Sequence, residues 1–204
     1  EQLLPIISDS KLELVSREDL FLNITYDIDR QILEKSKLQP DLSGMGTTLT
    51  ALSILDKNIE LLHIGDSRCY RYRDKKLEQL SYDHTVMQEL LDQGRLTPEE
   101  VFDHPQRSLL TQALMGDSGI DPVLVSYEIK KGDKFLLCSD GLTNVLSNYE
   151  INKIIEATED SKVAAALITE VLSKGAPDNI TIIWSEVIQS DQDDFVKKLG
   201  SANE

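Results

Sequence analysis

The chain has 204 residues, of which 36 are acidic and 21 are basic, so its formal net charge is -15. This charge repels phosphate backbones and argues against general nucleic-acid binding. A hydrophobic fraction of 40% supports one compact domain and argues against a second full domain. No apolar run approaches about 18 residues and no basic-then-apolar leader is present, so the sequence indicates neither a membrane span nor a signal peptide.

The N-terminal part of the chain predicts one long helix followed by short strands. Residues 16–36 begin with a Ser-x-x-Asp capping pattern and then place an apolar residue at every fourth position, at Leu20, Ile24, Ile28 and Ile32. Segments rich in β-branched and aromatic residues follow, separated by polar turns, and predict strands at 47–55, 59–65, 69–73 and 77–81. We expect these strands to form one antiparallel meander.

The middle of the chain predicts a helical insertion between strands. Residues 84–94 have the pattern of a short helix, and Thr97-x-x-Glu100 is a capping box with proline at the first helical position. We therefore expect residues 82–115 to interrupt the sheet.

The C-terminal part returns to strands and then adds two helices. Strands are predicted at 123–129, at 134–140 and, after the helices, at 179–188. One helix opens with the capping box Ser147-x-x-Glu150, and another spans 163–175 with Gly175 at its C-terminal end. Residues 189–204 are polar and are expected to form a flexible tail.

The order of these elements predicts an α+β fold. Strands come in runs and helices come in runs, which favours antiparallel sheets covered by helices over a doubly wound parallel sheet. The two cysteines, Cys69 and Cys138, lie in apolar strand-like runs without metal-ligand spacing, so we expect buried free thiols and a cytoplasmic location.

Three short motifs place an aspartate at the end of a strand beside small or polar residues. They are Gly65-Asp66-Ser67-Arg68, Ser139-Asp140-Gly141 and Pro177-Asp178-Asn179. A hard cation such as Mg²⁺ or Mn²⁺ prefers a few carboxylates and several waters, so aspartates meeting at strand ends could bind one. Each motif alone also fits an Asx-turn or a helix cap.

Two other kinds of site are disfavoured. Ser139 has no GxSxG surroundings and the three histidines show no Ser-His-Asp order, which argues against a serine nucleophile. The same histidines, His63, His84 and His104, lack the spacing of a zinc site. His63 lies in the middle of a predicted strand and is expected to be structural.

Several motifs occur together in the order of one family. SGMGTT, GDSR, Asp83-His84-Thr85, HPQR, LLCSDGLT and GAPDNIT span residues 43–181. In this order the chain resembles, over residues 1–188, a bacterial metal-dependent protein serine/threonine phosphatase of the PP2C (PPM) family. The resemblance implies a β-sandwich of two mainly antiparallel sheets flanked by helices, and hydrolysis by a water activated at a binuclear Mg²⁺ or Mn²⁺ centre.

Matching the motifs position by position gives the roles that the resemblance implies. Asp140 and Asp178 would hold the two core metals and Asp66 a third ion, with Asn179 supporting Asp178. Residues 82–115 resemble the family's flap beside the active site, where His104 and Arg107 would touch the phosphorylated protein substrate. A cognate Ser/Thr kinase is the expected counterpart of such an enzyme.

Two motifs of the family's N-terminal strands, Arg-x-x-Asn-Glu-Asp and Asp-Gly-x-Gly-Gly, are missing from the chain. Residues 1–8 resemble the helix after these strands, so we expect the N-terminal strands to be missing and the exposed sheet edges to pair with or exchange strands with another chain. The missing motif keeps open a catalytically incomplete PP2C-like binding or regulatory module. A hydrolase of another phosphoester is a further alternative.

Overall fold

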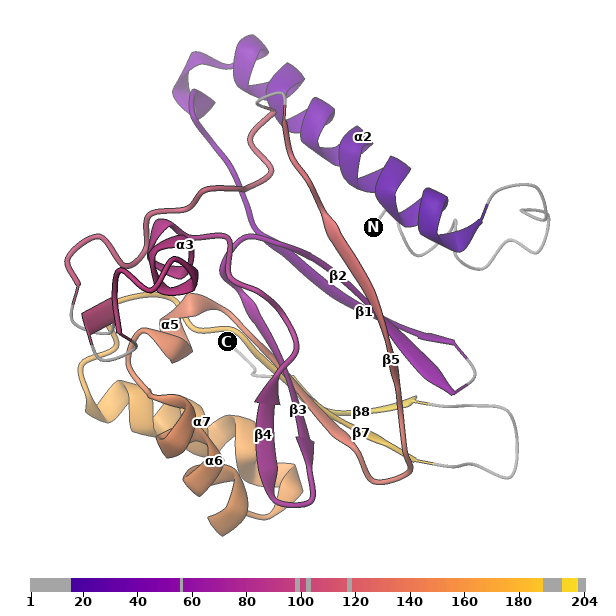
Figure 1. The fold of residues 1–204 in the computed structure, drawn as a ribbon, viewed down its shortest axis with the longest axis vertical. Helices are drawn as coiled ribbons and strands as arrows, with labels where there is room; N and C mark the ends of the chain where they lie inside the picture. The colour runs from indigo at the N-terminus through magenta and orange to yellow at the C-terminus, as the bar shows by residue number, and fades with distance from the viewer. Residues whose placement is uncertain are drawn as a thin grey trace.

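The computed structural model describes residues 16–55, 57–97, 100–101, 104–116, 119–188 and 196–201. It contains two antiparallel sheets with helices against their outer sides (Figure 1). The α+β sandwich predicted from the order of elements is thereby confirmed. The helix expected at residues 1–8 lies outside the described residues.

The strands divide into a sheet of three and a sheet of five. The first has the order β1-β2-β5, with bounds Leu49–Leu55, Asn58–Ile64 and Val123–Glu128. The second has the order β4-β3-β6-β7-β8. Its bounds are Lys76–Gln79, Arg68–Arg73, Lys134–Cys138, Ile182–Val187 and Val196–Ser201.

The prediction of one continuous meander is wrong, because β2 and β3 belong to different sheets. The chain crosses between the sheets at Gly65, which has a φ of 107°. A Cβ at Gly65 would lie 2.3 Å from Thr48 Cγ2, so only glycine fits this crossing without a shift of its neighbour. The crossing brings Asp66 to the end of the sandwich.

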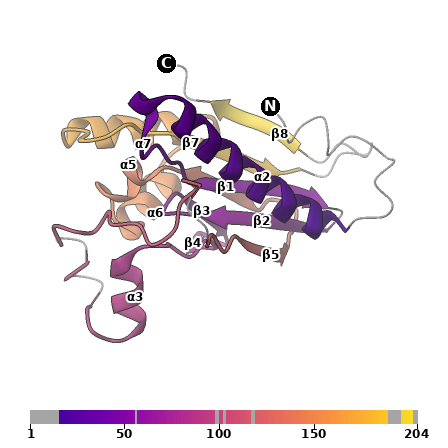
Figure 2. The same cartoon turned by 90° about the horizontal axis from the view of Figure 1, so that it is seen from above.

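Helix α2 (Arg17–Leu38) covers the three-stranded sheet (Figure 2). It begins as predicted, since the Asp19 N–H donates to Ser16 Oγ at 3.0 Å. Its buried residues are Phe21, Ile24, Thr25 and Asp29, so of the four apolar positions that the spacing predicted only Ile24 is buried. The buried face includes Asp29, whose Oδ1 accepts the N–H groups of Met115 and Gly116 at 2.9 and 2.7 Å.

Three helices pack on the outer side of the five-stranded sheet. They are α5 (Asp140–Thr143), α6 (Asn148–Ala157) and α7 (Val163–Ser173). The predicted capping box of α6 forms, and Gly175 follows α7 with a φ of 99°. One core lies between these helices and the sheet and includes Tyr70, Leu136, Leu142, Ile151, Leu167 and Trp184.

A second core lies between the two sheets. It contains Ile59, Leu61, Cys69, Leu80, Phe135 and Val187. Both cysteines are free and buried, as predicted. Burying these apolar side chains on both sides of the five-stranded sheet fixes the register of its strands, because a slip by one residue would turn each side chain to the opposite core.

Short helices connect the remaining elements. Helix α3 (Val86–Asp92) lies between β4 and β5, where a helix was predicted, and 3-10 turns occur at Pro40–Leu42 and Asp160–Lys162. The predicted capping box at Thr97 also forms, since its N–H donates to Glu100 Oε2 at 2.8 Å. Within the described ranges, no helix is long and apolar enough to cross a bilayer.

The sequence predicted a flexible tail at residues 189–204, but part of this segment is a strand. Residues Val196–Ser201 form β8, which pairs antiparallel with β7 at the edge of the sheet. The polarity of the segment gave no sign of this strand, because the edge of a sheet offers backbone hydrogen bonds to a polar strand as readily as to an apolar one.

Candidate active site

The three aspartate motifs lie at neighbouring strand ends of the five-stranded sheet. Asp66 precedes β3, Asp140 follows β6 and Asp178 precedes β7. The register pairs Arg68 with Cys138 and Cys138 with Ile182, so these three strand ends lie side by side. Sequence positions more than 110 residues apart are thereby brought to one end of the sandwich.

The Ser139-Asp140-Gly141 turn is joined directly to the loop that carries Asp178. The Ser139 N–H donates to Thr181 O at 3.1 Å, and the Thr181 N–H donates to Ser139 Oγ at 3.0 Å. A Cβ at Gly141 would lie 2.2 Å from Asn179 O, so the two loops can approach this closely only because residue 141 is glycine. Ser139 thus connects loops, which agrees with the argument against a serine nucleophile.

The aspartates of the site disfavour one another's charge. Burial, with the nearby carboxylates Asp140 and Asp83, raises the pKa of Asp66 to about 6. Burial and the charge of Asp178 raise the pKa of Asp140. Like charges held together without a neutralising partner create a place where a cation is favoured.

Two carboxylates of the site are held by hydrogen bonds from neighbouring residues. Asn144 Nδ2 donates to Asp140 Oδ2 at 2.9 Å. The Asn179 backbone N–H donates to Asp178 Oδ1 at 2.7 Å. The sequence predicted that Asn179 supports Asp178, and in the structure this hydrogen bond comes from the Asn179 backbone.

The donor set fits a hard divalent cation in its chemistry, since aspartate oxygens are the ligands that Mg²⁺ and Mn²⁺ prefer. Among the residues that the structure describes, however, no group of three or more His, Cys, Asp or Glu side chains is close enough to hold a metal ion. Asp66, Asp140 and Asp178 would therefore each contribute to a centre that needs further oxygen ligands, from water or from other residues.

A small pocket of about 90 Å³ separates these aspartates from the insertion. Its walls include Asp66 and Asp140 on the sheet side and Gln88, Leu91 and Arg107 on the insertion side. The structure thus brings the predicted residue Arg107 to the site. The lining does not include two other described residues, His104 and Asp178; His104 Nδ1 instead accepts the N–H of Gln106 at 3.1 Å.

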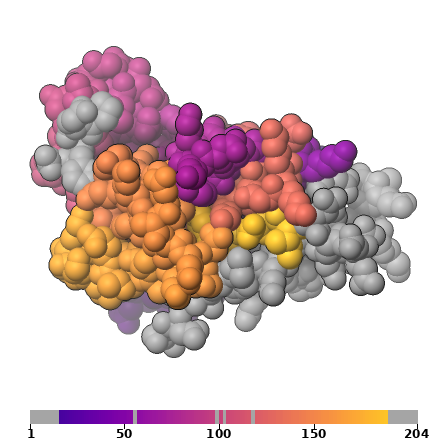
Figure 3. All heavy atoms as spheres, turned by 90° about the horizontal axis from the view of Figure 1, so that it is seen from below, coloured from indigo at the N-terminus to yellow at the C-terminus, as the bar shows by residue number. Residues whose placement is uncertain are grey.

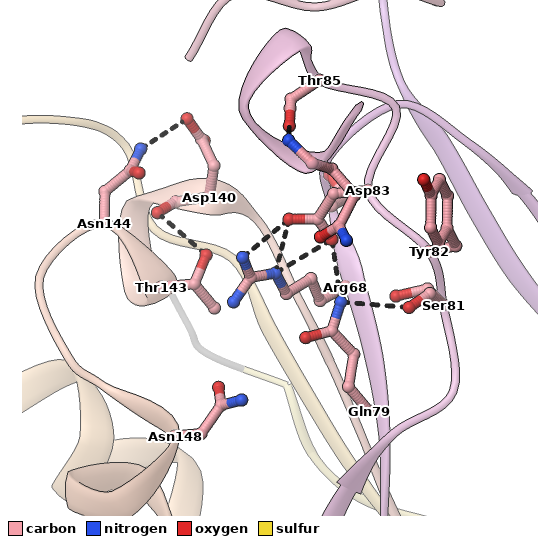
Figure 4. A network of polar contacts seen from close by, with 12 residues as sticks. Arg68, Gln79, Ser81, Tyr82, Asp83, Thr85, Asp140, Thr143, Asn144 and Asn148 are labelled. Atoms are coloured by element: carbon pink, nitrogen blue, oxygen red, sulfur yellow. Dashed lines mark hydrogen bonds and ion pairs between the residues drawn. The ribbon is translucent and has the colours of Figure 1, made fainter. Parts of the chain in front are cut away.

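A partly buried ion pair joins the sheet to the base of the insertion (Figure 4). Arg68 donates from Nε to both oxygens of Asp83, at 3.0 and 2.8 Å, and from the terminal nitrogen Nη2 to Oδ2 at 2.6 Å. The other terminal nitrogen of Arg68, Nη1, donates to Tyr70 Oη at 3.1 Å. Asp83 also accepts a hydrogen bond from Gln79 Nε2 at 2.8 Å. All three nitrogens of the guanidinium make a contact, so Arg68 positions the loops around the pocket that it also lines.

Two histidines support the crossing at Gly65. His63 is buried, with Nδ1 bonded to Thr50 Oγ1 and Nε2 to Tyr82 O, both at 2.9 Å. Burial and the neighbouring His84 lower the pKa of His63 to about 4. The Gly65 N–H donates to His84 Nδ1 at 3.1 Å. The structural role predicted for His63 is borne out by these contacts.

Sequence reasoning missed Asp83 and Asn144 as parts of the site. Asn144 lies four residues after Asp140, the spacing of neighbours on one face of a helix, and this signal could have identified it. Asp83 carries no such local signal, because its partner Arg68 is 15 residues away and meets it only after β3 and β4 have paired.

Comparison with known proteins shows the family to which the chain is similar. The family model of protein phosphatase 2C matches residues 3–174. The chain is 44% identical over 160 residues to the serine/threonine protein phosphatase PstP of Mycobacterium tuberculosis, covering 78% of this chain and 31% of that protein. It is 34% identical over 186 residues to the protein phosphatase PhpP of Streptococcus pneumoniae, covering 90% of this chain and 75% of that protein.

A solved structure shows the same likeness. The catalytic domain of the phosphatase PstP in complex with two manganese ions is 40% identical in sequence, with a TM-score of 0.72, and the match covers 79% of this chain and 67% of that one. The chain thus spans less than a third of the full length of the PstP protein and about two thirds of its catalytic domain.

Proposed function

The chain belongs to the protein phosphatase 2C family, and on this premise we propose that it acts as a serine/threonine protein phosphatase. It would remove phosphate from phosphoserine and phosphothreonine residues of proteins with the help of Mg²⁺ or Mn²⁺. The observation that carries the proposal is the position of Asp66, Asp140 and Asp178 at neighbouring strand ends of one sheet, where burial and neighbouring carboxylates also raise the pKa values of Asp66 and Asp140. Three carboxylates without cations would repel an approaching phosphoryl group. Cations bound between the carboxylates would offset this negative charge and allow the phosphoryl group to bind.

In this proposal Asp140 and Asp178 hold the two core metals, and Asp66 contributes to a third. When bound, such ions would supply Lewis-acid chemistry, lowering the pKa of a water molecule and offsetting charge on the phosphoryl oxygens. The residues of the chain do the positioning: Asn144 orients the Asp140 carboxylate, and the Asn179 N–H orients that of Asp178.

The insertion side of the pocket would receive the substrate. Arg107 faces the same pocket as Asp66 and Asp140, and a guanidinium is suited to a phosphoryl oxygen or a nearby substrate group. His104 remains a prediction for substrate binding through the surface of the insertion.

The test is turnover of a phosphothreonine peptide in the presence of Mn²⁺ by the full product of the gene that encodes this chain. We expect Asp140→Ala and Asp178→Ala each to lower kcat/KM by more than about 100-fold, because even residues behind the metal ligands typically cost 10- to 100-fold. Normal turnover by both variants would contradict the metal assignment. Assays on other phosphoesters would separate a protein phosphatase from a broader phosphoester hydrolase.

A second candidate is a PP2C-like binding or regulatory module without catalysis. It is favoured by one observation: the described residues contain no group of three metal-ligating side chains. Reading the gene upstream of the Glu1 codon discriminates between the two. An Asp-Gly-x-Gly-Gly motif there would argue for the enzyme, and metal-independent phosphopeptide binding without turnover would argue for the module.

The partners of the proposed enzyme are phosphorylated proteins and a cognate Ser/Thr kinase, with the cytoplasm as the proposed location. We also propose that another strand pairs with β1, whose outer edge has no strand partner among the described residues. Light scattering across a concentration series tests whether this edge recruits a second chain, because strand exchange would raise the measured mass with concentration.

A further inference from the structure

The end of the sandwich opposite the candidate active site carries a pocket with the opposite charge. Strand β3 starts at Arg68, beside the aspartates, and ends at Arg73, roughly 17 Å away at the rise of a β-strand. There the β3–β4 and β5–β6 turns lie next to each other, as the view of this end shows (Figure 3). A pocket of about 170 Å³ lies between them, which we call the basic pocket.

The lining of the basic pocket has a surplus of cations. It contains four basic residues, Arg73, Lys130, Lys131 and Lys134, and two acidic ones, Asp74 and Asp133, so four minus two gives a net charge of +2. Tyr72 and Gly132 complete the lining. This local surplus occurs in a chain whose formal net charge is -15.

Two of the cations are fixed in place by carboxylates. Arg73 donates to both oxygens of the buried Asp133, at 2.6 and 2.5 Å, and Asp133 Oδ2 also accepts the Lys130 N–H at 2.7 Å. Lys134 Nζ contacts both oxygens of Asp160 at 2.6 Å. With Arg73 and Lys134 neutralised in this way, the lining keeps two cations, Lys130 and Lys131, and one carboxylate, Asp74, so two minus one leaves an unpaired charge of +1.

The remaining lysines have no ion-pair partner among the residues that the structure describes. Within the described part of the chain, no ion pair or side-chain hydrogen bond involves the ammonium groups of Lys130, Lys131, Lys75 or Lys76, and all four residues are exposed. The backbone that presents them is constrained, because Asp74 and Lys75 both have a positive φ, 51° and 62°, as in a tight hairpin turn. The basic pocket is therefore lined by two ammonium groups without an ion-pair partner among the described residues, Lys130 and Lys131, and the adjacent turn exposes Lys75 and Lys76 beside it.

We propose that the basic pocket docks an acidic, phosphorylated segment of a protein partner, separate from the phosphoryl group that is hydrolysed. The inference rests on the proposed function, because a phosphoprotein substrate supplies such segments. Lysine ammonium groups suit a phosphoryl dianion as point charges. A short segment meets mainly the local charge, because salt screens interactions beyond about 8 Å. An extended anionic surface, such as a bilayer or a duplex, would instead face the acidic remainder of the molecule.

Binding is tested without turnover, in EDTA, by fluorescence anisotropy of a labelled acidic peptide with two phosphoserines. We expect the double variant Lys130→Glu/Lys131→Glu to bind about tenfold more weakly or worse, because like charges then face the peptide. The neutral double variant Lys130→Gln/Lys131→Gln should lose less of its affinity for the peptide. The matched control Lys35→Glu/Lys37→Glu changes the net charge equally at two exposed lysines of α2 and should bind like the unmodified chain.

Four results would overturn the proposal. The first two are an equal loss of peptide affinity in the Lys35/Lys37 control variant and an unchanged affinity in the Lys130/Lys131 variants. The other two are an equal affinity for the unphosphorylated peptide and a loss of peptide binding in Asp140→Ala. Sedimentation with phosphatidylserine vesicles that depends on the same lysines, without peptide binding, would assign the pocket to a lipid instead and also overturn it. Because no turnover is measured, failure of the phosphatase proposal would leave these binding results interpretable.

Discussion

The two ends of strand β3 carry similar ion pairs but are left with opposite unpaired charges. Arg68 binds Asp83 at one end and Arg73 binds Asp133 at the other, each through two nitrogens of the guanidinium. Beyond these pairs, the first end gathers carboxylates and the second gathers lysines. A paired charge holds the fold together, whereas the unpaired charges are those available for a ligand.

The pKa values of the aspartates express this difference. Burial raises the pKa of Asp133, but the hydrogen bonds from Arg73 and the Lys130 N–H outweigh it and hold that pKa below its ordinary value. At the other end, burial and neighbouring carboxylates raise the pKa of Asp66 to about 6 and also raise that of Asp140. Burial raises the pKa at both ends, and the net direction depends on whether a cation of the chain is within reach.

The largest expected effect comes from breaking each ion pair in turn. Arg68→Ala and Arg73→Ala should each lower the free energy of unfolding by about 3–5 kcal/mol, because each leaves a buried carboxylate without its partner. Only Arg68→Ala should also lower turnover of p-nitrophenyl phosphate by the full gene product, since Arg68 joins the sheet to the loops around the site. Urea unfolding measures the change in stability, and steady-state kinetics measure the change in turnover. An equal loss of turnover in the two variants would show that the two ends of β3 do not act independently.

A smaller effect is expected from the side chain that orients Asp140. Asn144→Ala should weaken Mn²⁺ binding by about 10- to 100-fold, the usual cost of removing a residue behind a metal ligand. Isothermal titration with Mn²⁺ measures it. The control Asn23→Ala removes an exposed asparagine of α2 and should leave the affinity unchanged; a normal affinity in Asn144→Ala would mean that the hydrogen bond to Asp140 is dispensable.

The contact between the two aspartate loops can be tested with one methyl group. Gly141→Ala should destabilise the fold by about 1–3 kcal/mol, because the new Cβ meets the backbone oxygen of Asn179 at 2.2 Å. Gly46→Ala is the comparison variant, since its new Cβ would meet the Met115 side chain at 2.5 Å and a backbone oxygen, Leu114 O, only at 3.2 Å. Equal unfolding energies of the two variants would show that the Asp178 loop yields easily.

The smallest effect concerns pH. Because the folded pKa of Asp66 is raised from its ordinary 3.8 to about 6, the folded state is penalised as pH rises through that interval, and the penalty is complete above pH 6. Asp66→Asn should therefore stabilise the metal-free chain more at pH 7 than at pH 4, by less than about 1 kcal/mol after solvent screening. Urea unfolding in EDTA at both values measures it, and a larger gain at pH 4 would reverse the assigned sign.

Much of the local structure could be predicted from the sequence. The capping boxes at Thr97 and Ser147, the start of α2 at Ser16 and most strands were found from short patterns, since these depend on hydrogen bonds and side-chain periodicity within a few residues. The partition of strands into two sheets was missed, because it depends on the crossing at Gly65. The strand at 196–201 was missed because its partner, β7, is provided by the rest of the fold.

The sequence by itself determined the family and the aspartates at its strand ends, because those motifs are short and their order along the chain is specific. Only the tertiary structure decided which charges are left unpaired. Arg68 and Asp83, or Arg73 and Asp133, are 15 and 60 residues apart and neutralise each other only after the strands have paired. That pairing leaves acidic side chains at one end of the sandwich and basic ones at the other, because electrostatic balance depends on distances in space.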